Sequence, residues 1–217
     1  MLITELFASV QGEGVRVGVP TVFVRLARCN LRCSWCDSEF TFTGGEQRTV
    51  EQVAAAVERF GPLPNICITG GEPLIQRREL RVLIDTLLEL PSVHTVEVET
   101  GGSLPIWSAH HPRLFWDLDV KCPGSGMDHH NRLDNLALLR ANDELKFVLT
   151  DRADFEWASA FVYEHLADTP ASVYFQPAWG MVEPADLVTW LVAEPVSGVR
   201  LSLQTHKYIW SPDLRGV

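Results

Sequence analysis

The chain has 217 residues, enough for one substantial hydrophobic core and too few for two domains of ordinary size. Its composition, 46% hydrophobic and 21% charged residues, is typical of a soluble globular protein. The net charge of -10 argues against broad binding to nucleic acids or to anionic membranes. An anionic ligand would therefore have to meet locally placed arginine or lysine side chains.

The cysteine content and the start of the chain indicate where the protein works. Five cysteines are an odd number, and three of them fall between Cys29 and Cys36. This is a poor disulfide framework and is typical of a metal site in a reducing compartment. Residues 1–5 lack the features of a signal peptide, and no apolar run reaches membrane-spanning length. We therefore expect a cytoplasmic protein.

Strands and helices are expected to alternate along the chain. Strands are predicted over residues 21–27, 65–69, 95–100, 114–121, 144–150, 171–176 and 199–204. Helices are predicted over residues 49–60, 77–90, 132–140, 152–166 and 184–192, and the first begins with a capping-box pattern at Thr49. The alternation predicts an α/β fold with a parallel sheet, and the absence of linkers and repeats predicts a single domain over residues 1–217.

The predicted strands have one apolar and one polar face. Alternate residues of a strand point to opposite sides of the sheet. The polar side receives Arg25, Thr69, Glu97, Glu99, Asp117, Asp119, Lys121, Glu144, Lys146, Gln176, Ser202, Gln204 and His206. One alternative is an antiparallel sheet with a solvated face. The intervening helices favour a partial, TIM-like barrel instead, with helices outside, a charged cavity inside and the site at the C-terminal ends of the strands.

The loop after the first of these strands contains Cys29, Cys33 and Cys36. A structural zinc site needs four ligands, and no fourth Cys or His lies nearby in the sequence. Three thiolates can hold three irons of a four-iron cluster and leave the fourth iron open for chemistry. The alternative is a zinc site with a distant fourth ligand, for which the candidates are Cys67, Cys122 and His206. Of these, Cys67 lies inside an apolar strand, as a buried small residue would.

Two further motifs lie at strand ends. Residues 69–73 read Thr-Gly-Gly-Glu-Pro. Paired glycines allow close approach of the backbone to a ligand, and Glu72 can accept a hydrogen bond from an ammonium group. Glu99, at the end of another strand, could bind ribose hydroxyls or accept a proton. The alternative for Glu99 is a solvated acid at the strand end.

The Cys-x3-Cys-x2-Cys spacing, with Trp35 before the last cysteine, resembles the signature of the radical S-adenosylmethionine (SAM) superfamily. Residues 70–73 resemble the motif with which that superfamily holds the amino group of SAM. The resemblance implies that Cys29, Cys33 and Cys36 hold a [4Fe-4S] cluster. In that superfamily the open iron binds SAM, which is cleaved to give a 5′-deoxyadenosyl radical.

Other stretches narrow the resemblance to the 7-carboxy-7-deazaguanine synthase family. They are residues 11–14 (Gln-Gly-Glu-Gly), Arg25, residues 119–121 (Asp-Val-Lys) with Pro123, residues 175–177 (Phe-Gln-Pro) and residues 204–208 (Gln-Thr-His-Lys-Tyr). Members of this family convert 6-carboxy-5,6,7,8-tetrahydropterin to 7-carboxy-7-deazaguanine with loss of ammonia, on the route to queuosine and other 7-deazapurines. The resemblance extends from Gln11 to the C-terminus.

The same resemblance implies roles for individual residues. SAM would be lined by Trp35, Gly71, Glu72, Asp119, Val120, Lys121, Gln176, Pro177, Ala178 and Trp179. The substrate would be bound by Val10, Gln11, Gly12, Glu13, Arg25, Thr69 and Val217, and the Arg25 guanidinium suits its carboxylate. Mg²⁺ would bind Ser38, which is a threonine in some members. Glu99 or His206 would move protons, and Asp119 stands where the family has a serine.

Partners and competing functions complete the expectations. The resemblance implies a small-molecule pterin substrate, a homodimer and an electron donor such as a flavodoxin or ferredoxin, with no direct nucleic-acid or membrane partner. A glycyl-radical-enzyme activase is an alternative that shares the cysteine spacing. It does not account for residues 11–14, Arg25 or residues 204–208. A non-catalytic zinc-binding module is the alternative from a different class.

Overall fold

The computed structural model describes residues 1–108 and 111–217, whose strands join one nine-stranded sheet in the order β3-β1-β2-β4-β5-β6-β7-β8-β9. The strands are β1 (Leu2–Val10), β2 (Pro20–Leu26), β3 (Glu46–Gln47), β4 (Asn65–Gly70), β5 (Thr95–Thr100), β6 (Leu114–Asp119), β7 (Glu144–Leu149), β8 (Ser172–Pro177) and β9 (Val199–Leu201). The α-helices are α1 (Val50–Glu58), α2 (Arg77–Glu89), α3 (Arg152–His165), α4 (Pro184–Ala193) and α5 (His206–Ile209). No helix in these two ranges has the length and apolar character needed to cross a membrane.

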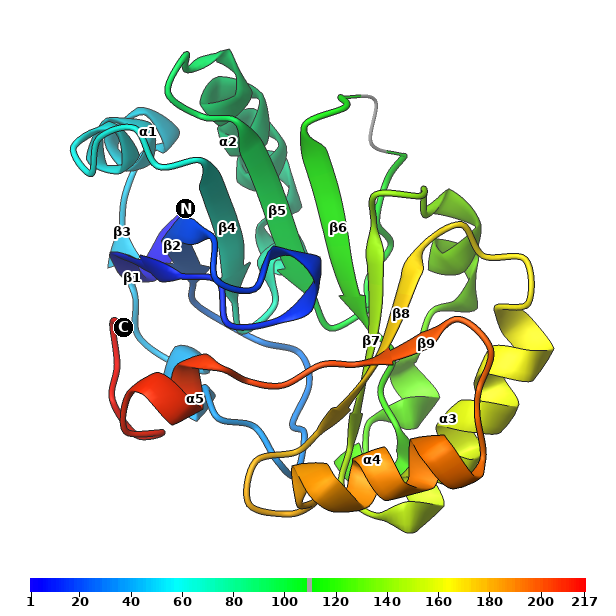
Figure 1. Ribbon diagram of the computed structural model, residues 1–217. Coiled ribbons are helices and arrows are strands. Elements are labelled where there is room, and N and C mark those ends of the chain that lie inside the picture. The colour runs from blue at the N-terminus through cyan, green and yellow to red at the C-terminus, as the bar shows by residue number, and fades with distance from the viewer. Residues whose placement is uncertain (109–110) are drawn as a thin grey trace.

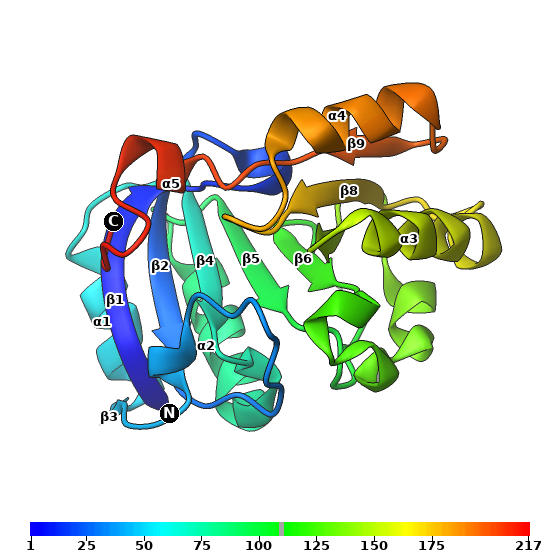
Figure 2. The ribbon, with the colours of Figure 1, turned by 90° about the horizontal axis from the view of Figure 1, so that it is seen from below.

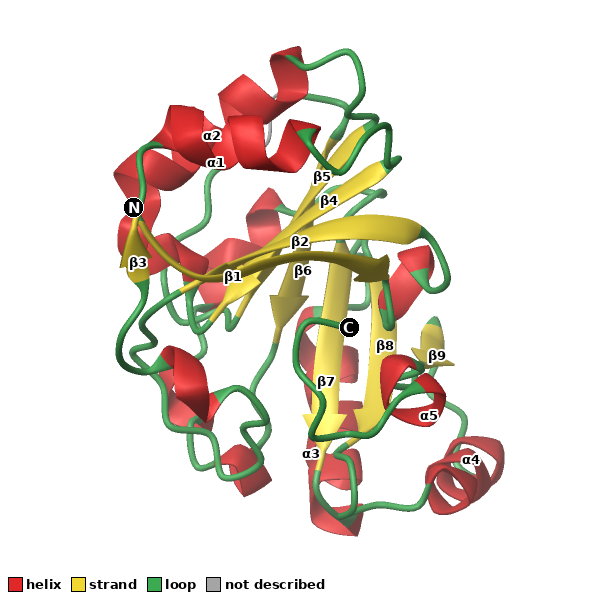
Figure 3. Ribbon diagram, turned by 90° about the vertical axis from the view of Figure 1, so that its left-hand side faces the viewer, coloured by secondary structure: helices red, strands yellow, loops and turns green. Residues whose placement is uncertain are grey.

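The sheet is an open arc of mostly parallel strands. Neighbouring strands are parallel from β2 to β9, whereas β1 runs antiparallel to β2 and to β3. Helices α1, α2 and α3 lie along the outer side of the arc, and α5 lies close to β1 (Figures 1 and 2). Figure 3 shows the same arrangement from the β1 side. The predicted α/β partial barrel with outer helices is confirmed, and the C-terminal ends of its parallel strands meet at one edge.

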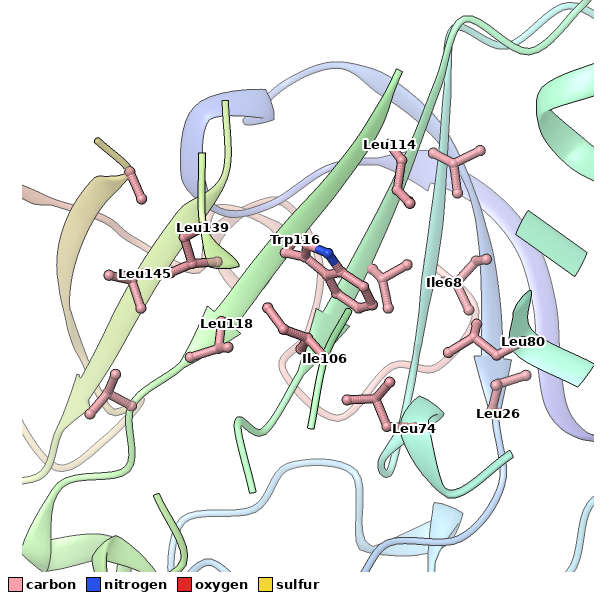
Figure 4. Close-up of a cluster of buried hydrophobic side chains, with 14 of the residues drawn as sticks. Leu26, Ile68, Leu74, Leu80, Ile106, Leu114, Trp116, Leu118, Leu139 and Leu145 are labelled. Carbon is pink, nitrogen blue, oxygen red and sulfur yellow. The ribbon is translucent and has the colours of Figure 1, made fainter. Parts of the chain in front are cut away.

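The hydrophobic core lies between the outer face of the sheet and helices α1, α2 and α3. Its largest fully buried side chain is Trp116 of β6, which packs edge to face on Trp107 and donates its indole N–H to the Trp107 carbonyl at 3.2 Å. Figure 4 shows Trp116 among Leu118 and Leu145 of the strands and Leu80 of α2. The opposite face of the same strands is polar, so the predicted alternation is confirmed.

Most predicted elements are present, with ends shifted by a few residues. The capping box is confirmed, since Thr49 Oγ1 accepts from the Gln52 N–H at 3.3 Å and the Gln52 side chain accepts from the Thr49 N–H at 2.9 Å. Cys67 is fully buried inside β4, as expected. Strands β1 and β3 and helix α5 were not predicted, because they are a terminal strand, a two-residue strand and a single helical turn.

The prediction of a regular helix over residues 132–140 is wrong. The segment is a 3₁₀ helix, Leu133–Leu138, in which Asn135 is buried. The Asn135 side chain donates to the carbonyls of Gly102 and Leu104 and accepts from the Ile106 N–H. These bonds tie the segment to the loop after β5. A side chain committed to distant backbone groups favours a tight turn over an α-helix.

Candidate active site

A cavity of about 200 Å³ opens on the polar, concave side of the sheet, where the C-terminal ends of the strands meet. It brings together predicted site residues from most of the chain. Those that line it are Val10, Gln11, Gly12, Glu13, Arg25, Cys29, Cys33, Trp35, Cys36, Ser38, Thr69, Gly71, Glu99, Asp119, Lys121, Gln176, His206 and Val217. Groups predicted to bind a cluster, SAM and the substrate therefore face one shared space.

The three cysteines lie on the loop that follows β2. Their thiols are free, and burial raises the pKa of Cys29 and of Cys33. The loop rests on the end of β4, where the Glu72 N–H donates to the Arg28 carbonyl at 2.8 Å. A Cβ on Gly71 would lie 2.3 Å from that carbonyl oxygen and 2.8 Å from the Cys29 Cβ, so only glycine fits. The loop is thus fixed with its three thiols on the cavity wall, an arrangement that fits a cluster bound by three thiolates.

The alternative ligands for a zinc site are placed differently. Cys67 and Cys122 are fully buried and are absent from the cavity lining, whereas His206 lines it. Within residues 1–108 and 111–217, no group of three or more His, Cys, Asp or Glu side chains is arranged to hold a single metal ion. A four-iron cluster does not need three ligands around one metal ion, because each of its thiolates binds a different iron.

Glu72 lies behind the cavity wall. Its buried carboxylate accepts from the Leu74 N–H at 2.9 Å, from Thr100 Oγ1 at 2.9 Å and from the Gly101 N–H at 2.8 Å. Burial raises the pKa of Glu72, against the effect of these donors. The side chain therefore joins the loops after β4 and β5. Its contact with the amino group of SAM stays a prediction.

Lys121, which is buried, and Asp119, which is partly buried, form an ion pair on the cysteine side of the cavity. The Lys121 ammonium lies 2.5 Å from Asp119 Oδ2 and 4.7 Å from the centre of the Trp35 ring. Burial alone would lower the pKa of Lys121, but Asp119 and the neighbouring Cys33 raise it. The lysine is therefore a permanent cation beside the cysteine loop.

Several residues that were predicted to contact SAM do not line this cavity. The Val120 side chain belongs to the hydrophobic core, and its N–H donates to the Lys146 carbonyl at 2.8 Å. Pro177 ends β8 and is buried. Ala178 and Trp179 line a neighbouring hollow that also includes the C-terminal tail. Their roles stay predictions.

The substrate side of the cavity is rich in paired polar groups. Gln11 donates from Nε2 to Glu97 at 3.0 Å and to Glu99 at 3.1 Å. Glu13 pairs with the Lys146 ammonium at 2.8 Å, and Arg25 lies 3.4 Å from a carboxylate oxygen of Glu5. Carboxylate, amide and guanidinium groups are thus placed together, as recognition of a polar heterocycle with a carboxylate requires.

Glu13, Glu99 and His206 on the substrate side of the cavity also have clearly altered pKa values. Burial alone would raise the pKa of Glu13, but the Lys146 cation lowers it to about 2. Burial raises the pKa of Glu99, in spite of Lys146 nearby. Burial lowers the pKa of His206, against the pull of Glu13. Glu13 is therefore a fixed anion at neutral pH, whereas Glu99 and His206 are suited to exchanging protons.

Lys146 also lines the cavity, although no motif in the sequence predicts a role for it. Its ammonium lies 2.8 Å from Glu13, 3.0 Å from Asp117 and 3.6 Å from Asp119. Burial would lower the pKa of Lys146, but these carboxylates raise it well above the ordinary value. The spacing of Glu144 and Lys146, two residues apart on one strand, did place the lysine on the polar face of the sheet.

Comparisons with known proteins agree with this geometry. Residues 24–142 match the model of the radical SAM superfamily. The chain therefore belongs to the radical SAM enzymes, which use a [4Fe-4S] cluster and SAM.

Its relatives define the family more narrowly. The chain is 43% identical to the 7-carboxy-7-deazaguanine synthase of Koribacter versatilis, with all of both chains covered. It is 37% identical to that of Chlorobaculum tepidum, covering 99% of this chain and 96% of the relative. The crystal structure of QueE from Escherichia coli superposes with a TM-score of 0.74 at 26% identity, covering 94% of each chain. The chain belongs to the 7-carboxy-7-deazaguanine synthase family.

Proposed function

We propose that this enzyme converts 6-carboxy-5,6,7,8-tetrahydropterin to 7-carboxy-7-deazaguanine with loss of ammonia, using SAM and Mg²⁺. The observation that supports this most strongly is that the cysteine loop shares one cavity with Gln11, Glu13, Arg25 and Glu99. A radical source and a recognition site for a carboxylated pterin would then lie side by side, as a reaction confined to one cavity needs.

The cysteine side of the cavity would hold the cluster and SAM. Cys29, Cys33 and Cys36 would bind three irons, and Trp35 and Gly71 would line the SAM beside them. When bound, the cluster and SAM supply the 5′-deoxyadenosyl radical that starts the ring contraction. The buried Lys121 cation would offset part of the negative charge of the three thiolates and of Asp119.

The opposite side would orient the substrate. The Arg25 guanidinium would pair with the substrate carboxylate, for which its planar geometry is suited. Glu13, held as an anion, would accept hydrogen bonds from the N–H groups of the pterin edge. Gln11 and Thr69 add neutral polar groups around the same space.

Mg²⁺ would bind at Ser38, beside the cluster loop. Ser38 lines the cavity, and its hydroxyl lies 3.8 Å from the Cys36 sulfur. Mg²⁺ keeps several waters and takes few protein ligands, so one hydroxyl together with substrate oxygens is a sufficient site. Val217 lines the cavity as well, which supports a substrate contact at the end of the tail.

Glu99 and His206 would handle the protons released and taken up when ammonia leaves. Both line the cavity. Burial raises the pKa of Glu99 toward neutral pH and lowers the pKa of His206, which favours a neutral imidazole that can accept a proton. Such groups serve as general acid or base near the operating pH. The flavodoxin- or ferredoxin-type electron donor, the homodimer and the cytoplasmic location stay predictions.

The test is an anaerobic assay with the reconstituted enzyme, a reductant, SAM, Mg²⁺ and carboxytetrahydropterin. We expect 7-carboxy-7-deazaguanine and ammonia from the wild-type enzyme and neither product from Cys33→Ala, which should also lose the visible absorption of the cluster. Release of 5′-deoxyadenosine without any deazaguanine would contradict the proposed substrate and leave only the superfamily assignment.

A further inference from the structure

The loop between β1 and β2, residues 11–19, crosses the concave face of the sheet to reach β7. In the sheet order, β2, β4, β5 and β6 separate β1 from β7. Figure 1 shows the loop extending from the end of β1 toward β7. Gln11 and Glu13 lie on this loop and line the cavity, so its position decides where both side chains point.

Two ion pairs hold the loop to β7. The Glu13 carboxylate lies 2.8 Å from the Lys146 ammonium, and the Arg16 guanidinium lies 2.8 Å from Glu144. Arg16 also pairs with Glu97 of β5 at 3.2 Å and lies 4.0 Å above the Phe115 ring. All of these charged side chains are largely buried, with at most 14% of the side chain exposed.

The backbone of the loop is fitted closely to its surroundings. The Val15 N–H donates to Glu144 at 2.8 Å. Gly14 has φ of +65°, and a Cβ there would lie 2.1 Å from a Glu144 oxygen. A Cβ on Gly12 would lie 2.1 Å from the His206 ring. Two glycines therefore let the loop pass close to β7 and to the C-terminal segment, because a side chain at either position would require Glu144 or His206 to move.

Arg16 differs from Glu13, the other charged residue of this loop, because it is absent from the cavity lining. We infer that Arg16 is a positioning residue, which fixes the loop through Glu97 and Glu144 so that Gln11 and Glu13 face the substrate. The inference rests on the proposed function only for the identity of that substrate. Without Arg16, the buried carboxyl groups of Glu97 and Glu144 would lose the guanidinium that bridges them to the loop.

The first measurement does not depend on the substrate. Amide hydrogen exchange of residues 11–19 is followed in the anaerobic holoenzyme, for wild type, Arg16→Met, Arg16→Lys and Arg152→Met. Arg152 is the matched control, since it pairs with Glu156 and Glu194 on the surface. We expect amide exchange in this loop to be at least about tenfold faster in Arg16→Met than in wild type, because a charge-assisted hydrogen bond is lost. Exchange in Arg152→Met should match wild type.

The second measurement is steady-state kinetics with carboxytetrahydropterin. We expect Arg16→Met to raise KM about tenfold while kcat falls less than threefold, with partial rescue in Arg16→Lys. Cluster content and the KM for SAM should match wild type.

The outcomes are distinct. Unchanged exchange in Arg16→Met overturns the inference, as does faster exchange with an unchanged KM for the pterin. Equal effects in Arg152→Met overturn it too, because they would indicate general destabilisation. Failure of the wild-type enzyme to convert the pterin contradicts the proposed function instead, and the exchange result alone then decides whether Arg16 fixes the loop.

Discussion

Replacing Lys146 by methionine should destabilise the protein far more than loss of an ordinary ion pair. The substitution leaves Glu13, Asp117 and Asp119 without the cation that lies 2.8 to 3.6 Å from them. The pKa of Glu13 is lowered from 4.5 to about 2. A change of that size corresponds to about 3 kcal/mol at 1.36 kcal/mol per pKa unit. Removal of one partner from a buried pair costs about 3 to 5 kcal/mol, so the two magnitudes agree.

The assay is chemical unfolding at pH 7, with Lys207→Met as the matched control. Lys207 pairs with Asp37, whose side chain is 49% exposed, so this control should lose less than about 1 kcal/mol. Because the pKa of Glu13 is lowered in the folded protein, its contribution is present above pH 4.5 and is lost as the pH falls toward 2. The difference between wild type and Lys146→Met should therefore shrink over that range. Equal losses in the two lysine variants at pH 7 would refute the reasoning.

Three further predictions concern single residues. Burial raises the pKa of Glu144 to about 7, so the stability of wild type relative to Glu144→Gln should fall as the pH rises from 4.5 to about 7. Unfolding free energies at pH 5 and pH 7.5 check this, and a difference between the two proteins that does not change with pH would contradict it. Arg25→Met should raise KM for the pterin roughly 10- to 100-fold, with SAM binding intact, since it removes a charge-assisted bond to the substrate carboxylate; titration of both ligands tests it. Arg215 pairs with Glu5 and lies 3.8 Å from the centre of the Phe40 ring, so it should anchor the C-terminal tail. Arg215→Ala should therefore speed amide hydrogen exchange in residues 211–217. Unchanged exchange would show that another residue anchors the tail.

The convergence of the site could be predicted from the sequence because of a simple rule of α/β folds. Cys29 follows β2, Thr69 and Glu99 each lie one residue before the end of their strand, β4 and β5, and Asp119 ends β6. Parallel strands bring their C-terminal ends to one edge, so residues far apart in sequence meet there without knowledge of any individual contact. The alternation of polar residues along the strands then placed Lys146 on the concave face, although it did not show what the lysine contacts.

The ion pairs that hold the loop of residues 11–19 in place could not be predicted in this way. The Glu13–Lys146 and Arg16–Glu144 pairs join residues 133 and 128 positions apart. Such pairs depend on the curvature of the sheet and the path of one loop, which no periodicity encodes. The tight turn around Asn135 was missed for a similar reason, because its apolar spacing resembles that of a helix. Its conformation depends on bonds to Gly102 and Leu104 instead.

The central claim is that one cavity joins the radical source to a pterin whose ring is contracted. The measurement that tests it most directly is the amount of 7-carboxy-7-deazaguanine formed for each SAM consumed, in an anaerobic reaction with carboxytetrahydropterin in excess. We expect many product molecules for each SAM lost, because the substrate radical recovers its hydrogen within the same cavity. Consumption of SAM without formation of the deazaguanine would contradict the account.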